Sequence, residues 1–207
     1  VWIMGIKEES IRLRPAKPEF EEGLKFAHYL DQAAEGFFRS MLGPDSETIL
    51  ASAFIDSDNS LSYEHVIFAE IDKKTVGMSS SFSEQQQRKF SDEPLQRAAK
   101  KNAIRLKLLR ILFSPVWRIL ETIPEGDYYI QGIAIDPEYR GRGIGSLLMD
   151  DIESRAKAGG FSRLSLDVSA KNDGARRLYK RLGMVESSTW PSSKILPTVF
   201  IRMSKYL

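Results

Sequence analysis

Cysteine is missing from this sequence of 207 residues, and histidine occurs only twice, as His28 and His65. Without cysteine the chain has no disulfide, no thiolate metal site and no cysteine nucleophile. Two histidines are too few for a histidine-rich metal site, which usually takes about three or four protein ligands. The sequence therefore predicts a function that needs no bound metal.

Long apolar runs and a strong excess of one charge are also missing. No stretch of about 18 apolar residues is present, so no transmembrane helix is expected, and the opening residues 1–6 are too short for a signal peptide. The 30 basic and 28 acidic residues leave a formal net charge of +2, which gives no general attraction to nucleic acid. We expect a cytoplasmic protein without a nucleic-acid partner.

The N-terminal half predicts a strand, helices and a hairpin. Residues 10–14 alternate polar and apolar side chains, which is typical of a strand, and residues 18–42 carry apolar side chains at the spacing of one or two helices. Residues 45–63 are read as polar, and the run Asp56-Ser57-Asp58-Asn59 within them predicts a loop. The short apolar runs at 65–71 and 75–82 predict the two strands of a hairpin.

An insertion at about 84–126 differs in kind from the rest. Apolar residues recur there at three- and four-residue steps with basic residues between them, which predicts a pair of basic amphipathic helices, broken near Ser114-Pro115. In one interpretation the apolar stripe covers a sheet and the charges face water. In another the helices make a peripheral contact with a membrane surface or an acidic partner.

After Gly126 strands and helices alternate. The patterns predict strands at 128–135, 163–168 and 198–203, with helices at 143–158 and 173–182 between them. This order is typical of an α/β sandwich. The length of the chain suits one such domain and falls short of two.

Three alternate glycines, Gly141, Gly143 and Gly145, open the predicted helix at 143–158. Glycine lets backbone N–H groups come close to a ligand, and the first turn of a helix attracts anions through its unpaired N–H groups and its dipole. Arg140 and Arg142 add positive charge at the same place. The loop therefore predicts a phosphate or pyrophosphate site, with a glycine-rich turn and solvated arginines as the alternative.

Two common phosphate-binding loops are tested by the spacing. A P-loop ends in Gly-Lys-Ser/Thr, whereas this loop ends in Gly145-Ser146-Leu147. The dinucleotide pattern G-x-G-x-x-G fails from either Gly141 or Gly143, although Asp167 ends the next strand as a ribose-binding acid would. A nicotinamide-dependent enzyme stays open as an alternative.

Two segments resemble the motifs of the GCN5-related N-acetyltransferases (GNATs). Residues 133–145 resemble the motif Q/R-x-x-G-x-G/A, with Arg140, Gly143 and Gly145 in its three fixed places. Residues 172–184 resemble a second family motif, although Met184 stands where an aromatic residue is commoner. The resemblance is strong over about a third of the chain, at 128–186.

The resemblance implies a fold and a reaction. The fold would be an α/β GNAT domain over residues 1–207, with a mixed central sheet of about six to seven strands flanked by helices and splayed between its two central parallel strands. The reaction would be direct transfer of an acetyl group from acetyl-CoA, without a metal, to a primary amine of a small molecule or a peptide. A non-catalytic acyl-CoA-binding or sensory domain is the alternative, and a homodimer is left open.

The resemblance also implies roles for individual residues. The strand backbone would pair with the pantetheine arm and polarise the thioester carbonyl, the glycine loop would bind the pyrophosphate, and Asn172 would bond the arm or cap the following helix. The cofactor-binding residues expected on this basis are Ile133, Ala134, Ile135, Arg140, Gly141, Arg142, Gly143, Ile144, Gly145 and Asn172.

Two side chains are expected to handle protons. Tyr179 is the candidate general acid for the departing thiolate, because a phenol has a pKa near 10. Asp167 is the candidate general base, since family members that acetylate ribosomal proteins have a Glu at that spacing. Asp is a weak base unless burial raises its pKa, so a water chain or an ion-paired Asp167 remains an alternative.

Overall fold

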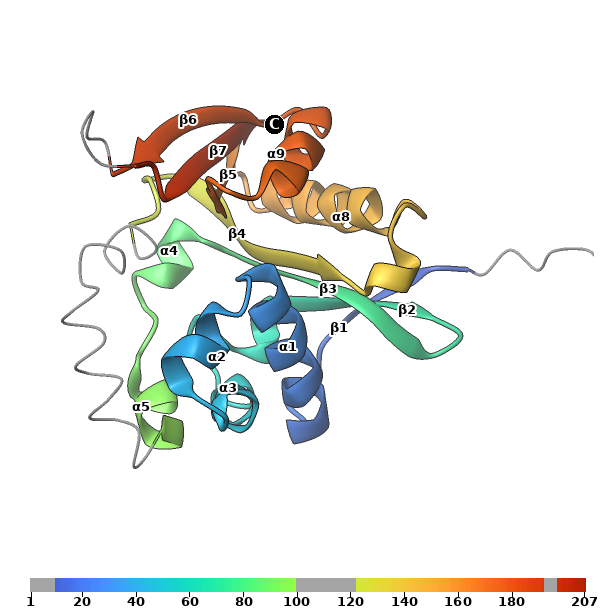
Figure 1. Cartoon of the computed structure of the whole chain (residues 1–207), viewed down its shortest axis with the longest axis vertical. Coiled ribbons are helices and arrows are strands. Elements are labelled where there is room, and N and C mark those ends of the chain that lie inside the picture. The colour runs from blue at the N-terminus through green and yellow to red at the C-terminus, as the bar shows by residue number, and fades with distance from the viewer. Residues whose placement is uncertain (1–9, 100–121, 192–196) are drawn as a thin grey trace, which may run out of the picture.

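A single mixed sheet runs through the computed structural model, which describes residues 10–99, 122–191 and 197–207 (Figure 1). Its strands lie in the order β1-β2-β3-β4-β5-β7-β6, and only the central pair β4–β5 is parallel. The strands are β1 (Arg12–Pro15), β2 (Val66–Ile71), β3 (Lys74–Ser83), β4 (Asp127–Ile135), β5 (Arg163–Ser169), β6 (Val185–Trp190) and β7 (Phe200–Tyr206).

Helices cover the sheet from both sides. They are α1 (Phe20–Ala33), α2 (Phe37–Leu42), α3 (Ser46–Phe54), α4 (Glu84–Gln87), α5 (Glu93–Ala99), α8 (Ile144–Ala158) and α9 (Asp173–Arg181), with short 3-10 turns η1 (Tyr63–His65) and η3 (Pro137–Tyr139). Among the described residues, no helix has the length and apolar character needed to cross a membrane.

The alternation of β4 assigns each helix to a face. Ala134 packs in one core with the buried residues of α1 and α3. Ile133 and Ile135 point the other way, into a core with Ile144 and Leu148 of α8. Since successive side chains of a strand face opposite sides of the sheet, α1 and α8 cover opposite faces.

The two central strands separate soon after they meet. Their ladder contains only three residue pairs, from Asp127 with Arg163 to Tyr129 with Ser165. Next to this point β4 carries a bulge against β3, because Ser80 pairs with Gly132 while Ser81 pairs with Ile130. A bulge bends its strand, so residues 130–135 run on without a neighbour on the β5 side.

The paired end is held by an ion pair. The buried carboxylate of Asp127 contacts Arg163, which is also its register partner across the β4–β5 ladder. A charge-assisted hydrogen bond at this point favours one register of the two strands. The strands are therefore joined at one end and open at the other.

The sequence-based expectations for the fold are largely confirmed. The sheet has seven strands, its central parallel strands splay, and the hairpin β2–β3 and the helices α1, α2, α8 and α9 lie where the patterns put them. The reading of residues 45–63 as polar is wrong over α3, which buries Ile49, Leu50 and Phe54. The loop predicted at 56–59 is confirmed, because these residues lie in neither a helix nor a strand.

Two further differences concern β6 and the insertion. The edge strand β6 was missed because its side chains are almost all exposed, so no apolar alternation marks it. The expected helix pair begins as the short helices α4 and α5. The predicted break at Ser114-Pro115 lies outside the described residues, so that part stays a prediction.

Neighbouring leucines on α8 test the packing. Leu148 is fully buried against the sheet, whereas Leu147 is exposed. We expect Leu148→Ala to lower the free energy of unfolding by about 2–5 kcal/mol, because a cavity replaces buried apolar atoms. Leu147→Ala should cost less than about 1 kcal/mol. Urea unfolding followed by circular dichroism measures both, and equal losses would contradict this orientation of α8.

Candidate active site

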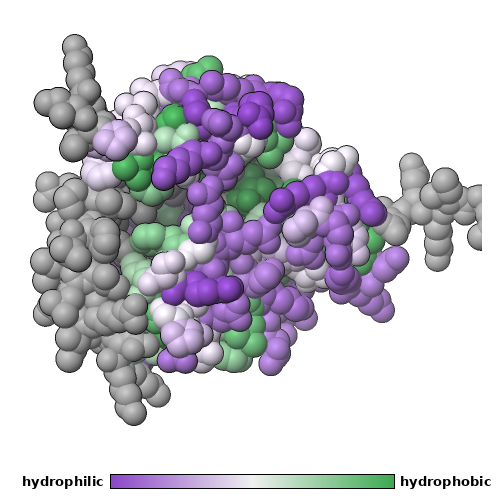
Figure 2. Space-filling model, viewed as in Figure 1, coloured by the Kyte–Doolittle hydropathy of each residue, from purple (hydrophilic) through white to green (hydrophobic). Residues whose placement is uncertain are grey.

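The open end of the sheet forms the central hollow of the molecule. Figure 2 shows apolar side chains on the floor of a hollow that opens between α9 and α1, in the view of Figure 1. Beyond the pair Tyr129–Ser165, the β4 and β5 strands leave a gap between them. The predicted site residues come from the elements around this gap.

The backbone of β4 offers hydrogen-bonding groups to the gap. Asp136 N–H donates to Val76 O of β3 at 2.9 Å, and backbone groups in an antiparallel ladder alternate between the two sides of a strand. Ile135 and Ile133 therefore direct their N–H and C=O groups away from β3, whereas Ala134 directs its groups toward β3. Gln32 Nε2 and Arg140 Nε already donate to Ile135 O, at 3.0 and 3.1 Å.

The N-terminus of α8 lies beyond the open end of β4. Its N-cap Gly143 has a φ of 82°, a left-handed conformation that glycine adopts without strain. In the part of the chain that the structure describes, no acceptor takes a hydrogen bond from the N–H of Ile144 or Gly145. These donors and the helix dipole form a fitting cradle for a pyrophosphate.

Positive charge gathers beside this helix end. The ring of Tyr139 contacts two cations, with Lys74 Nζ at 5.0 Å and Arg142 Cζ at 5.1 Å from its centroid. Lys74 also forms an ion pair with Glu138 at 2.9 Å. Arg140 is fixed by its bond to Ile135 O. Arg140 and Arg142 are both exposed, so their charge is accessible to an anion at this point.

Tyr179 comes from α9 and packs with the core that contains Ile130, Met149 and Leu166. Burial raises the pKa of Tyr179 to about 12. The phenol therefore keeps its proton at neutral pH and can serve as a proton donor.

Asn172 hydrogen-bonds both to α9 and to the residues that follow α1. Its Oδ1 accepts from Ala175 N–H at 2.9 Å, so it is the N-cap of α9, one of the two roles expected for it. Its Nδ2 donates to Glu35 Oε1 at 2.6 Å. Since Glu35 follows α1, this hydrogen bond connects the start of α9 with the end of α1.

The carboxylate of Asp167 accepts three hydrogen bonds. Arg202 donates from Nε to Oδ1 at 3.0 Å and from Nη2 to Oδ2 at 2.7 Å, and Tyr129 Oη donates to Oδ2 at 3.2 Å. Only 2% of the Asp167 side chain is exposed. Protonation of either oxygen would weaken a charge-assisted hydrogen bond, so this geometry matches the ion-paired alternative and disfavours a base.

The two predicted proton-handling residues lie on opposite faces of the sheet. Leu166 and Val168 share the core of Tyr179, and Asp167 between them points to the other face by strand alternation. Tyr129 lies on that same face. Burial and the neighbouring Asp167 carboxylate raise the pKa of the Tyr129 phenol, so Tyr129 stays protonated as the donor to Asp167.

Sequence reasoning missed Arg202 and Glu35 as neighbours of the site. Both contact predicted residues across long sequence separations: Arg202 to Asp167 over 35 residues and Glu35 to Asn172 over 137. No local motif marks such pairs. The expected strand at 198–203 did place Arg202 in the sheet, but its partner follows only from the β5–β7 register.

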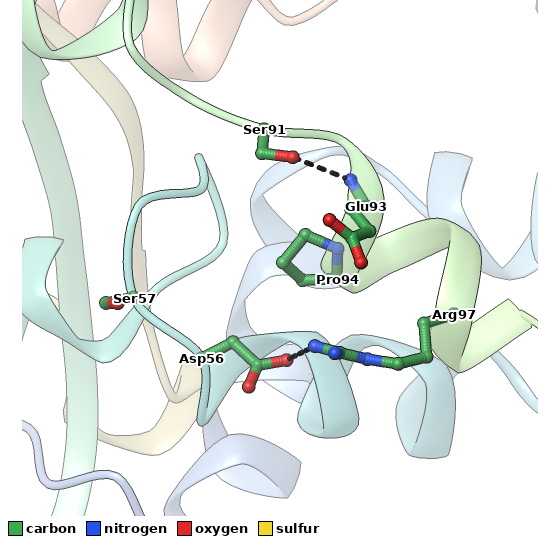
Figure 3. A pocket seen from close by; sticks show the side chains of 6 residues that line it. All are labelled: Asp56, Ser57, Ser91, Glu93, Pro94 and Arg97. Carbon is green, nitrogen blue, oxygen red and sulfur yellow. Dashed lines mark hydrogen bonds and ion pairs between the residues drawn. The ribbon is translucent and has the colours of Figure 1, made fainter.

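A second hollow lies away from the predicted site residues. It has a volume of about 260 Å³ between α5 and the loop after α3, and the ion pair of Asp56 with Arg97, at 2.6 Å, crosses it (Figure 3). None of its lining residues belongs to β4, β5, α8 or α9. We therefore place the candidate site in the gap.

Comparison with known proteins identifies the family. A family model described as the acetyltransferase (GNAT) family matches residues 27–184. The chain belongs to the GNAT family. This GNAT is 40% identical over 65 residues to a thialysine N-epsilon-acetyltransferase of Bos taurus, covering 30% of this chain and 38% of that protein. It is 36% identical over 80 residues to a mycothiol acetyltransferase of Corynebacterium aurimucosum, covering 37% and 26%.

Solved GNAT structures share the fold across nearly the whole chain. An N-acetyltransferase from Staphylococcus aureus superposes with a TM-score of 0.64 and 18% identity, covering 94% of this chain and all of that one. The ribosomal-protein-S18-alanine N-acetyltransferase of Escherichia coli gives 0.54 and 18%, covering 95% and 94%. The chain spans less than half the length of the curated relatives it matches.

The family match confirms the predicted acetyltransferase family and the predicted fold. The expected roles of single residues stay predictions, since a shared fold does not assign them. Among the described residues, no group of three or more His, Asp or Glu side chains could hold a metal ion.

The buried ion pair predicts a large effect of one substitution. Asp167→Asn removes the charge that faces Arg202, whose side chain is itself largely buried. We expect a loss of about 3–5 kcal/mol in the free energy of unfolding, because a buried cation is left without its partner. Asp173→Asn, which breaks an exposed ion pair with Arg176, should cost less than about 1 kcal/mol. Urea unfolding compares the two variants, and similar losses would contradict a buried pair.

Proposed function

We propose that this GNAT is an acetyl-CoA-dependent N-acetyltransferase that acetylates a primary amine of a small molecule or a peptide. The observation that carries the proposal is the gap beside β4, which runs toward the N–H groups of the first turn of α8, for which the described residues offer no acceptor. An elongated molecule with an anionic end suits this arrangement. The relatives named as N-acetyltransferases support it.

Backbone groups would make most of the cofactor contacts. The loop at 141–145 and the α8 N-terminus would bind the pyrophosphate, with Arg140 and Arg142 adding charge. The backbone of Ile133 and the N–H of Ile135 would pair with the pantetheine amides as an added strand. One of these two N–H groups would polarise the thioester carbonyl. Ala134 would contribute its small side chain rather than its backbone.

Bound acetyl-CoA would supply an acetyl carbon as a thioester, which the amine nitrogen attacks so that a C–N bond forms and the C–S bond breaks. Tyr179 would donate its proton to the departing sulfur and recover one from water. The amine must lose a proton, which we assign to water. We assign Asp167 to holding Tyr129 and Arg202, because both of its oxygens are already hydrogen-bonded.

A thiol-release assay tests the proposal as a whole. Free CoA should appear only when acetyl-CoA and a suitable amine are both present. Acetyl-CoA binding without thiol release across polyamines, amino acids, arylalkylamines and peptides would instead favour the non-catalytic sensor. Mass spectrometry of the amine product, with a gain of one acetyl group, completes the assay.

Tyr179→Phe removes the proposed acid but keeps the ring. We expect kcat to fall about 100-fold or more, with little change in the Kd for acetyl-CoA. In the unaltered protein kcat should not fall with an apparent pKa near 10, because the pKa of Tyr179 is about 12 and the proton stays bound. Tyr206→Phe, at a side chain that is 75% exposed, is the control. Unchanged kcat in Tyr179→Phe would remove this residue from the mechanism.

Substitutions at two glycines, one at each end of α8, distinguish the effect of backbone strain on stability from an effect on acetyl-CoA binding. Gly143 and Gly160 both have positive φ, at 82° and 78°, with no atom within 4 Å of an added Cβ. Each change to Ala should therefore cost a similar free energy of unfolding, about 1–2 kcal/mol. Only Gly143→Ala should raise the Kd for acetyl-CoA, measured by isothermal titration. An equal effect of both variants on that Kd would argue against the loop as the binding site.

A further inference from the structure

A pocket of about 320 Å³ lies on the face of the sheet opposite Tyr179. Asp167 and Arg202 belong to its lining, together with two aromatic residues, Trp190 and Phe200, and with Thr122, Ser188 and Thr189. Apart from Thr122, these residues come from β5, β6 and β7. A volume of this size is at the low end of the range for small-molecule sites, which begins at about 300 Å³.

The pocket adjoins the place where β4 and β5 separate. Asp167 lies two residues beyond Ser165, the last residue of β5 that pairs with β4. The hydroxyl of Tyr129, the last paired residue of β4, reaches Asp167 at 3.2 Å. Because Tyr179 packs on the other face, a group held in the gap would have Tyr179 on one side and this pocket on the other.

The charges in the pocket cancel. Among the described residues that line it, Asp167 and Arg202 carry charge, and they form a two-pronged ion pair with each other. The remaining terminal nitrogen, Arg202 Nη1, donates to Thr122 O at 2.8 Å. A second charge on a ligand would therefore lose water without gaining an opposite charge, which costs free energy.

The aromatic residues that line the pocket favour a ligand with a flat or branched apolar group. Trp190 and Phe200 occupy paired positions on β6 and β7, so their side chains lie on the same side of that ladder. Such surroundings also disfavour an ammonium ion, because desolvation favours the neutral form of an amine. The pocket would thus help to supply the unprotonated nitrogen without a dedicated basic side chain.

We propose that this pocket holds the body of the acceptor, and that the acceptor is a primary amine on an uncharged aromatic or branched apolar group, such as an arylalkylamine, rather than a polyamine or an amino acid. The proposal rests on the proposed acetyltransferase function. Trp190 and Phe200 are its specificity-determining residues.

The test compares amines in the thiol-release assay at saturating acetyl-CoA. With the unaltered protein, kcat/KM for 2-phenylethylamine should exceed that for 1,4-diaminobutane, spermidine and lysine by roughly tenfold or more. Trp190→Ala and Phe200→Ala should each raise the KM for 2-phenylethylamine roughly tenfold and leave the KM for acetyl-CoA unchanged. Val199→Ala, next to Phe200 in sequence but outside the pocket lining, is the matched control and should behave as the unaltered protein.

The aromatic variants remove packing as well as pocket contacts, so a variant that adds a charge provides an independent test. Ser188 is exposed on the edge strand β6 and pairs with Arg202, so Ser188→Asp adds a carboxylate on the pocket side of the sheet without opening the core. It should shift the ratio of kcat/KM toward 1,4-diaminobutane by roughly tenfold, because the second ammonium gains a partner.

The outcomes separate the two proposals. Preference for spermidine or lysine in the unaltered protein, or unchanged KM values in both aromatic variants with intact circular dichroism spectra, would overturn the pocket and leave the acetyltransferase in place. Thiol release with none of the amines, despite measured binding of acetyl-CoA, would overturn both.

Discussion

The separation of β4 from β5 is the constraint on which the rest of the site depends. The strands are tied at one end by the buried Asp127–Arg163 pair and diverge after three residue pairs, where β4 bulges at Gln131. A full ladder would satisfy every backbone group within the sheet and leave no edge for a ligand. The bulge and the short ladder together expose the backbone of Ile133 and Ile135 in the middle of the molecule rather than at its rim.

This separation also divides the chemistry between the two faces of the sheet. Tyr179 and the α8 N-terminus serve one face, and the Tyr129–Asp167–Arg202 cluster serves the other. The division follows from strand alternation, since Asp167 stands between Leu166 and Val168, which face the α8 side. In a transfer reaction two reactants meet at one point. The gap between β4 and β5 would let them approach from the two faces of the sheet, which carry different residues.

Local features of the sequence were sufficient to predict the glycine loop, the helices that flank it and the family of the protein. Glycines before a helix act through backbone geometry that depends on a few adjacent residues. The ion pair of Asp167 could not be predicted in the same way, because Arg202 reaches it through the pairing of β5 with β7. The segment at 45–63 was misread because its polar second half outweighed the apolar residues of α3, and β6 was missed because an exposed edge strand has no buried face to mark it.

The cancelled charges of Asp167 and Arg202 have a consequence for how the site responds to its solvent. Dissolved salt screens interactions between exposed charges over a Debye length of about 8 Å at physiological ionic strength. The α8 end, with Arg140, Arg142 and Lys74 around it, should therefore hold an anionic ligand less firmly as salt is added. The described residues that line the pocket beyond the gap carry no net charge, so the binding of an apolar body there should hardly depend on salt. Higher ionic strength would then weaken the binding of the anionic ligand at α8 and leave the binding of the apolar acceptor nearly unchanged.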